Sequence, residues 1–217
     1  MELVQKLISG TIVAGGLGTT AYYSVGKSDG ISIETYVTSR KRKLISEEAV
    51  WKQKEDKYKR LEDKSEDLIG EVENKDSKKT PVWRKLEKWC IKTKKKMFTD
   101  PSDGIYQRFV WWCLEEIDIK KQLELEGIKE VTNFEAKATQ FNDPSNLDSS
   151  FITGTGTGQP AEGKGKKPVT KDDVSGWCNP KKSTPFKHEL EQTYLRVKKW
   201  CFEEPEKPKE STSKKPK

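Results

Sequence analysis

The stretch WCIKTKKKMFTDPSDGIYQRFVWWC, residues 89–113, decides the fold, because it begins and ends with a tryptophan–cysteine pair. A second stretch of the same length, WCNPKKSTPFKHELEQTYLRVKKWC at residues 177–201, has the same two ends. Shifting the chain by 88 positions aligns residues 89–116 with 177–204 and gives 10 identities in 28 positions. Self-similarity at a fixed offset indicates a repeated structural unit.

The aligned positions share aromatic residues that we expect to form the core of each unit. Their pattern is W-C-x7-F-x7-Y-x-R-x3-W-C-x-E-E. The predicted core residues are Trp89, Phe98, Tyr106, Trp112, Trp177, Phe186, Tyr194 and Trp200. The shared tyrosine and arginine could instead stack on bases or sugars, but the helical spacing of Tyr194 favours the core.

All four cysteines belong to these units, as Cys90, Cys113, Cys178 and Cys201. We expect two structural disulfides, one within each unit, if the domain lies outside the cytosol. A zinc site and free buried thiols are the alternatives. Zinc ligands normally occur in close C-x2-4-C or H-x3-5-H pairs, and the chain has no C-x-x-C motif, so a zinc or thioredoxin-like redox site fits poorly.

An antiparallel helix hairpin would bring the first cysteine pair together. The predicted helices cover residues 81–98, after a capping Thr-Pro start, and residues 105–127. The segment 100–104 between them is rich in turn residues. Cys90 and Cys113 then lie at the same level, in the range of about 7 Å between Cα atoms that a disulfide needs.

The second unit reaches the same closure by a different route. A Gly/Asn/Pro stretch surrounds Cys178, so we expect a loop there, and Thr184-Pro185 predicts a helix start. The 7 residues from Cys178 to Pro185 span about 23 Å if extended, and the 16 from Pro185 to Cys201 rise about 24 Å as a helix. The loop can therefore return along the helix and place the two cysteines side by side.

Residues 7–26 carry no charged side chain. A helix of about 20 residues is about 30 Å long, which matches the hydrocarbon core of a bilayer. Gly10, Ala14 and Gly18 place small residues on one face, as in packed membrane helices. We therefore expect residues 1–26 to be a signal anchor, a transmembrane helix that contacts the lipid bilayer through residues 7–26. A cleaved signal peptide and a soluble Gly-rich start are the alternatives.

Two features of the sequence oppose each other on membrane orientation. The basic residues 40–43 follow the uncharged run and would hold the C-terminal side inside the cell. Paired cysteines instead require an oxidising compartment. Because long domains cross the membrane largely regardless of charge, we expect a cell-membrane protein with the bulk of its chain extracellular.

The rest of the chain divides by composition. A charged helix with a narrow apolar stripe is predicted from Ser46 to about Glu73. Gly, Ser, Thr and Pro dominate the segment between the two units, as in flexible linkers. The predicted domains are the signal anchor at 1–26, a juxtamembrane connector and charged helix at 27–78, repeat unit 1 at 79–141, the linker at 142–173, repeat unit 2 at 174–204 and a disordered tail at 205–217.

The composition limits the core and the partners. Of 217 residues, 32% are hydrophobic and 35% are charged, whereas the apolar share of a typical domain is about 45–50%. The core is therefore confined to a few helices. The net charge of +7 permits weak attraction to anionic membranes or nucleic acid, but no nucleic-acid motif is present and we do not expect nucleic acid as the main partner.

The sequence contains no constellation of catalytic residues. An enzyme needs converging acid, base or nucleophile groups. His188 is the single histidine and is expected on the polar side of a helix. The pairs Glu115-Glu116 and Glu203-Glu204 do not form dyads, because adjacent helical residues point in different directions. We predict a protein without enzymatic activity, cofactor or metal.

The uncharged run with Ala14-Gly15-Gly16-Leu17-Gly18, followed by lysine-rich helices with Trp-Cys pairs, resembles paralogous membrane-associated proteins of haemotropic mycoplasmas. The resemblance covers the N-terminus and the general layout of the chain. It implies a membrane-associated, surface-displayed member of a large variable family with no assigned activity, and it transfers no functional residues.

The sequence thus predicts an all-α protein in which a membrane helix and a charged helix precede two Trp-Cys-bracketed units. The expected function is surface interaction or antigenic display, with a protein partner or a host surface ligand. The alternative is a basic module on the cytosolic face that binds nucleic acid or anionic lipid.

Overall fold

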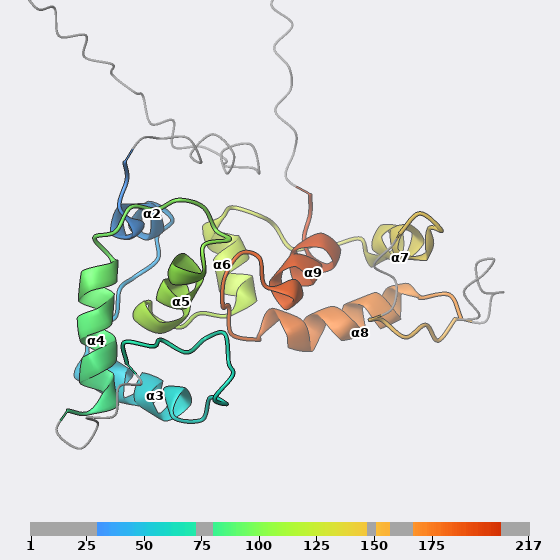
Figure 1. Ribbon diagram of the computed structural model, residues 1–217. Coiled ribbons are helices and arrows are strands. Elements are labelled where there is room, and N and C mark those ends of the chain that lie inside the picture. The colour runs from blue at the N-terminus through green and yellow to red at the C-terminus, as the bar shows by residue number, and fades with distance from the viewer. Residues whose placement is uncertain (1–29, 73–79, 147–150, 157–166, 205–217) are drawn as a thin grey trace, which may run out of the picture.

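The fold is all-α, as predicted, in the computed structural model of the chain (Figure 1). The structure describes residues 30–72, 80–146, 151–156 and 167–204. The predicted membrane helix at 7–26 and the tail at 205–217 lie outside these ranges. Within them the helices are α2 (Ile33–Ser39), α3 (Glu48–Tyr58), α4 (Val82–Thr93), α5 (Gly104–Cys113), α6 (Ile119–Leu125), α7 (Phe134–Asn142), α8 (Lys171–Lys182) and α9 (Gln192–Cys201).

The helices form two sets that follow each other along the chain. In the first set, α4 packs against both α3 and α5. In the second set, α8 packs against both α7 and α9, and α6 contacts α8 and α9. Figure 1 shows α4 at one edge of the molecule, α7 at the opposite edge, and α5 and α6 in the middle.

The backbone hydrogen bonds outside the helices recur from one set to the other. In each bond, the partner from residues 31–45 corresponds to a residue 86 positions later, and the partner from residues 96–115 corresponds to a residue 88 positions later. The corresponding pairs are Ile33 N to Lys96 O and Ile119 N to Thr184 O, Phe98 N to Ile31 O and Phe186 N to Ile117 O, Ile45 N to Cys113 O and Val131 N to Cys201 O, and Glu115 N to Lys43 O and Glu203 N to Lys129 O. The offset of 88 is the same one that relates the two Trp-Cys-bracketed stretches in the sequence.

Both expected disulfides are present. Cys90 on α4 is bonded to Cys113 at the end of α5, and Cys178 on α8 is bonded to Cys201 at the end of α9. The Cα atoms are 5.6 Å apart in each pair, in the usual range for a disulfide. The pairing predicted from the sequence is confirmed.

The prediction of a loop around Cys178 was wrong, because this cysteine lies inside α8. Thr170 and Asp173 form a capping box that starts the helix, which satisfies two backbone donors of its first turn. Pro180 is accommodated two residues before the end of α8. The cap and the packing against α7 and α9 outweigh the low helix propensity of the Gly/Asn/Pro stretch.

The predicted helix start at Thr184-Pro185 was also wrong. Pro185 forms an isolated bridge with Asp118, a position that suits a residue without a backbone donor. The helix α9 begins at Gln192, after Glu191 accepts a hydrogen bond from the Tyr194 amide at 2.8 Å. Both cysteine pairs therefore connect two helices, and the predicted extended return is not used.

The structure also shortens three predicted helices. The first predicted hairpin helix ends at Thr93 instead of residue 98. The second is interrupted after Cys113, because Leu114 forms a bridge with Leu44 before α6 begins. The charged helix predicted from residue 46 to 73 ends at Tyr58, whose hydroxyl accepts from Ile69 N at 2.8 Å and so holds the following loop.

The sets do not coincide with the predicted units. The connector contains α2, whose cap Ser32 accepts a hydrogen bond from Thr35 N at 3.1 Å. The contacts of α6 and α7 are with α8 and α9, whereas the predicted unit 79–141 would group them with α4 and α5. The predicted linker at 142–173 is shorter, because α8 already begins at Lys171.

We predict that each disulfide contributes about 3 kcal/mol to the free energy of unfolding, since each closes a loop of 23 positions in the unfolded chain. The variants C90S/C113S and C178S/C201S should each lose about this amount in urea unfolding followed by tryptophan fluorescence. Wild type in reductant serves as the control and should lose more than either variant. A loss below about 1 kcal/mol in either variant would contradict the prediction.

Candidate functional site

The predicted core residues occupy the interior of the two sets. Tyr106, Trp112, Tyr194 and Trp200 are fully buried. Trp89 and Phe186 are also buried, and Phe98 and Trp177 are partly buried against the same core. The Phe98–Tyr106 and Phe186–Tyr194 rings both lie 5.0 Å apart in an edge-to-face arrangement. The shared tyrosines thus have a structural position, and their rings are closed to bases or sugars.

A buried polar cluster joins the two helix sets. The Tyr106 hydroxyl donates to Glu189 Oε1 at 2.7 Å, and the two residues are 1% and 6% exposed. Glu189 Oε2 is buried without a hydrogen-bond donor among the described residues. Burial, followed by the charge of Glu189, raises the pKa of Tyr106 well above its usual value. This phenol therefore remains a proton donor to the carboxylate.

Two arginines complete the cluster. Arg42 is buried and donates to Gln122 Oε1 at 3.0 Å and to the Glu115 carbonyl at 3.2 Å. Burial lowers the pKa of Arg42, and Glu189 partly offsets that effect. The guanidinium of Arg40 lies 4.5 Å from the Tyr36 ring centroid. These side chains belong to the basic run at 40–43, so part of that run makes contacts inside the protein and is not exposed on its surface.

Tyr194 has a carboxylate partner of its own. Its hydroxyl donates to Glu126 Oε1 at 2.6 Å. Glu126 also accepts from Gln122 Nε2 at 3.0 Å and from Lys198 Nζ at 2.9 Å. Burial alone would raise the pKa of Glu126, but the charge of Lys198 and these hydrogen bonds hold it below the usual value. Among the described residues, Glu126 therefore accepts from Tyr194, Gln122 and Lys198, whereas the buried Oε2 of Glu189 has no donor.

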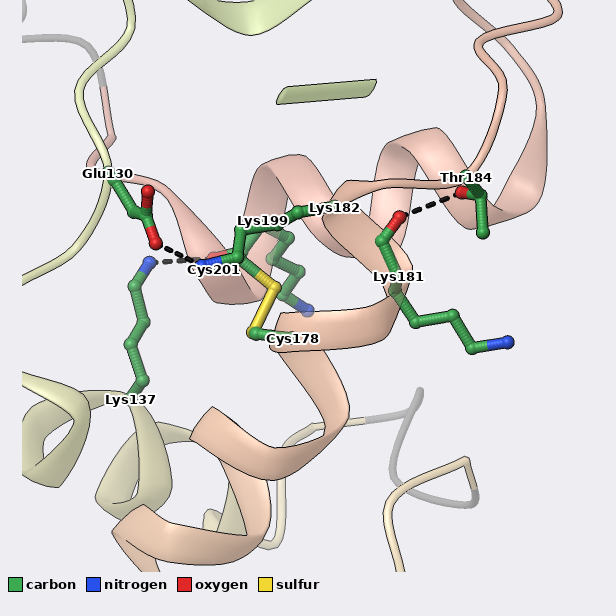
Figure 2. The surroundings of a disulfide bond; sticks show 8 residues. All are labelled: Glu130, Lys137, Cys178, Lys181, Lys182, Thr184, Lys199 and Cys201. Atoms are coloured by element: carbon green, nitrogen blue, oxygen red, sulfur yellow. Dashed lines mark hydrogen bonds and ion pairs between the residues drawn. A yellow bond between two sulfur atoms is a disulfide. The ribbon is translucent and has the colours of Figure 1, made fainter. Parts of the chain in front are cut away.

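Each set also contains a buried lysine that sequence reasoning missed. Lys54 Nζ donates to the Trp111 carbonyl at 2.7 Å, and Lys137 Nζ donates to the Lys199 carbonyl at 2.6 Å. Figure 2 shows Lys137 reaching α9 beside the Cys178–Cys201 bond. The two carbonyls are 88 positions apart in the chain. Both belong to the last turn of a helix, where carbonyls lack partners in the helix and favour cations.

A sequence signal for these lysines exists in hindsight. Lys54 lies between Trp51 and Tyr58, and Lys137 lies between Phe134 and Phe141, both with the spacing aromatic-x2-Lys-x3-aromatic. These spacings place the lysine on the apolar stripe of its helix. A charge on a stripe that faces the core has to find a partner there.

Burial lowers the pKa of Lys54 to about 8, and Glu116 opposes this shift. A lysine with such a pKa is a candidate nucleophile in general. Here the side chain is 3% exposed, and its nitrogen lies 5.0 Å from the Trp111 ring centroid. The amine is enclosed by protein, so its role is to cap α5.

The groups considered for catalysis are separate or already engaged. All four cysteines are in disulfides and therefore provide no thiolate. His188 is partly buried and precedes α9, so the prediction that it lies on the polar side of a helix was wrong. Its Nδ1 accepts from Leu190 N at 3.3 Å, and burial lowers its pKa. Among the described residues, no group of three or more His, Cys, Asp or Glu side chains is arranged to hold a metal.

Within the described ranges, none of the helices has the length and apolar character needed to cross a bilayer. Comparisons with protein-family models, with curated proteins and with solved structures found no match.

We predict that Tyr106→Phe destabilises the protein more than Tyr194→Phe. The first change removes the Tyr106 donor from the buried Glu189, whose Oε2 already lacks a partner among the described residues, at a cost of about 1.5–3 kcal/mol. The second leaves Glu126 bonded to Gln122 and Lys198, so the expected loss is about 1 kcal/mol. Urea unfolding at pH 7 measures both losses, and equal losses would argue against a special role for the Tyr106–Glu189 bond.

We also predict a rise in stability at alkaline pH that depends on Lys54. Its pKa is about 8 in the folded protein and 10.5 ordinarily, so the unfolded chain binds more protons between these values. The free energy of unfolding therefore increases as pH rises through this window. The increase should be measured from pH 7 to about 9.5, below the titration of tyrosines in the unfolded chain.

Lys54→Met should reduce this increase, because it removes the group whose pKa differs between the two states. Lys52→Met is the matched control, since Lys52 is 60% exposed on the same helix. The same pH slope in wild type and Lys54→Met would disprove the assignment.

Proposed function

We propose that this chain is a membrane-anchored, surface-exposed interaction or antigenic protein without catalytic activity. Residues 7–26 hold it in the bilayer, and the helical body is displayed outside the cell. The observation that carries the proposal is the pairing of all four cysteines in two equivalent disulfides. Such bonds persist in oxidising compartments and are rare in the cytosol.

A display role also agrees with how the chain is stabilised. Its hydrophobic content is 32%, so the core is small and crosslinks replace part of the missing burial. A body stabilised in this way keeps its shape outside the cell, where thiol reductants are scarce.

We infer that α2–α5 and α6–α9 are two copies of one four-helix unit. The recurring backbone bonds, the lysine caps and the Phe–Tyr pairs support this. The exposed positions differ between the copies: Arg84, Lys88 and Lys92 of α4 correspond to Asp172, Gly176 and Pro180 of α8. A shared scaffold that carries different exposed residues agrees with a role in surface recognition, because function resides in the residues that a scaffold displays.

The resemblance to membrane-associated proteins of haemotropic mycoplasmas fits this proposal and remains part of it. The partner would be a protein or a host surface ligand that contacts the exposed residues. The alternative is a basic module on the cytosolic face that binds nucleic acid or anionic lipid. The two functions differ in compartment and therefore in the redox state of the cysteines.

The test uses the full chain in its native cells, which are treated with an alkylating reagent before lysis. Non-reducing peptide mass spectrometry should detect the Cys90–Cys113 and Cys178–Cys201 crosslinks. Trypsin added to intact cells should degrade the helical body, and lysed cells provide the control for full digestion. Four alkylated thiols together with protection from trypsin would overturn the proposal and favour the cytosolic alternative.

A further inference from the structure

The exposed face of α4 is basic along its length. Arg84, Lys88 and Lys92 of α4 are exposed at intervals of four residues, which places them on one side of the helix, and Lys95 is exposed just beyond the end of the helix. Lys88 and Lys95, and the neighbouring Lys96, form no ion pair with a carboxylate of the described residues. Lys92 pairs with Glu71 at 3.1 Å, and both of these side chains are more than half exposed. The face therefore presents an excess of positive charge.

Two large apolar side chains accompany these charges. Ile91 is 53% exposed and Met97 is 62% exposed. Exposed apolar residues next to lysines are typical of helices that lie on membrane surfaces, where the lysines contact headgroups and the apolar side chains enter the interface.

This face is adjacent to the point where the described chain begins. Ser32 forms a bridge with Met97, and a side-chain carbon placed at Gly30 would lie 3.9 Å from Met97 Cε. Figure 1 shows the end of α4 next to α2. The uncharged run ends at Gly26. The four residue steps from Gly26 to Gly30 span at most about 14 Å. An anchor at 7–26 would thus hold Gly30, which is next to Met97, within about 14 Å of the end of the uncharged run.

The second copy lacks this face. The positions on α8 that correspond to Arg84, Lys88, Ile91 and Lys92 are Asp172, Gly176, Asn179 and Pro180. The basic and apolar residues are therefore not needed by the scaffold, because the same scaffold forms without them. They belong to the copy that follows the proposed anchor.

We propose that the exposed face of α4 binds the anionic headgroups of the membrane in which the chain is anchored. Lysine ammonium groups pair with lipid phosphates, and Ile91 and Met97 enter the interface. The inference rests on the proposed anchor, which supplies the short tether and hence a high local concentration of the face at the bilayer. A lipid surface is favoured over nucleic acid because the tether and the apolar side chains both fit it.

The test measures how fast Met97 of the full chain is oxidised on vesicles. Hydrogen peroxide is neutral and converts an accessible methionine to its sulfoxide. The chain has two methionines, Met1 and Met97, so peptide mass spectrometry resolves the site. On phosphatidylcholine vesicles with about 30% phosphatidylglycerol, oxidation of Met97 should be roughly fivefold slower than on pure phosphatidylcholine vesicles. Salt at about 0.5 M should remove the difference.

A charge-reversed variant and a matched control locate the effect. K88E/K92E/K95E should abolish the protection by anionic lipid. K121E/K129E/K171E makes the same change in net charge at exposed lysines of the second copy and should keep it. Circular dichroism and the intact disulfides check that both variants are folded.

The outcomes separate this inference from the proposed anchor. Chain that does not float with vesicles of either composition would overturn the anchor and this inference together. Chain that floats with both but shows equal Met97 oxidation on both would overturn this inference alone. Protection that survives in K88E/K92E/K95E would also overturn it, because another surface would then contact the lipid.

Discussion

The last turn of α5, and of its equivalent α9, is the constraint on which the structure depends. A helix ends with carbonyls that have no partner inside the helix, and these cannot be left unpaired when the end is buried. Here Ile45 N and Val131 N bind the carbonyls of Cys113 and Cys201. The amines of Lys54 and Lys137 bind carbonyls two residues earlier. The disulfides attach the same turns to α4 and α8.

This arrangement explains how a chain with so few apolar residues folds. The buried Trp112 and Trp200 directly precede the cysteines of these turns, and the Lys54 amine lies 5.0 Å from the Trp111 ring centroid and 6.0 Å from that of Trp112. Part of the charged content is therefore interior, where Lys54 and Lys137 bind carbonyls at helix ends and Lys198 binds the carboxylate of Glu126. Composition alone describes a mostly solvated chain, whereas the contacts show polar groups used as core partners.

The sequence was sufficient for the features that depend on local pattern. The Trp-Cys spacing predicted both disulfides, and the amphipathic stripes predicted an all-α fold. Sequence reasoning failed where tertiary contacts override propensity. Cys178 is helical because a capping box and two neighbouring helices support α8, and Pro185 bridges to Asp118 instead of starting a helix. The buried lysines and the Tyr106–Glu189 bond join residues far apart in sequence, and no local pattern of charges predicts which residues pair.

The Tyr106–Glu189 and Arg42–Gln122 bonds have a consequence for how such a protein can change over generations. Each bond joins one helix set to the other, so one half of the protein cannot be replaced independently of the other half. Replacement of one half by a different sequence would therefore bring a new partner to each buried group. A tolerated change would have to replace both partners of each of these bonds together. Alternatively, it would change only exposed positions, which do not contribute to the interior.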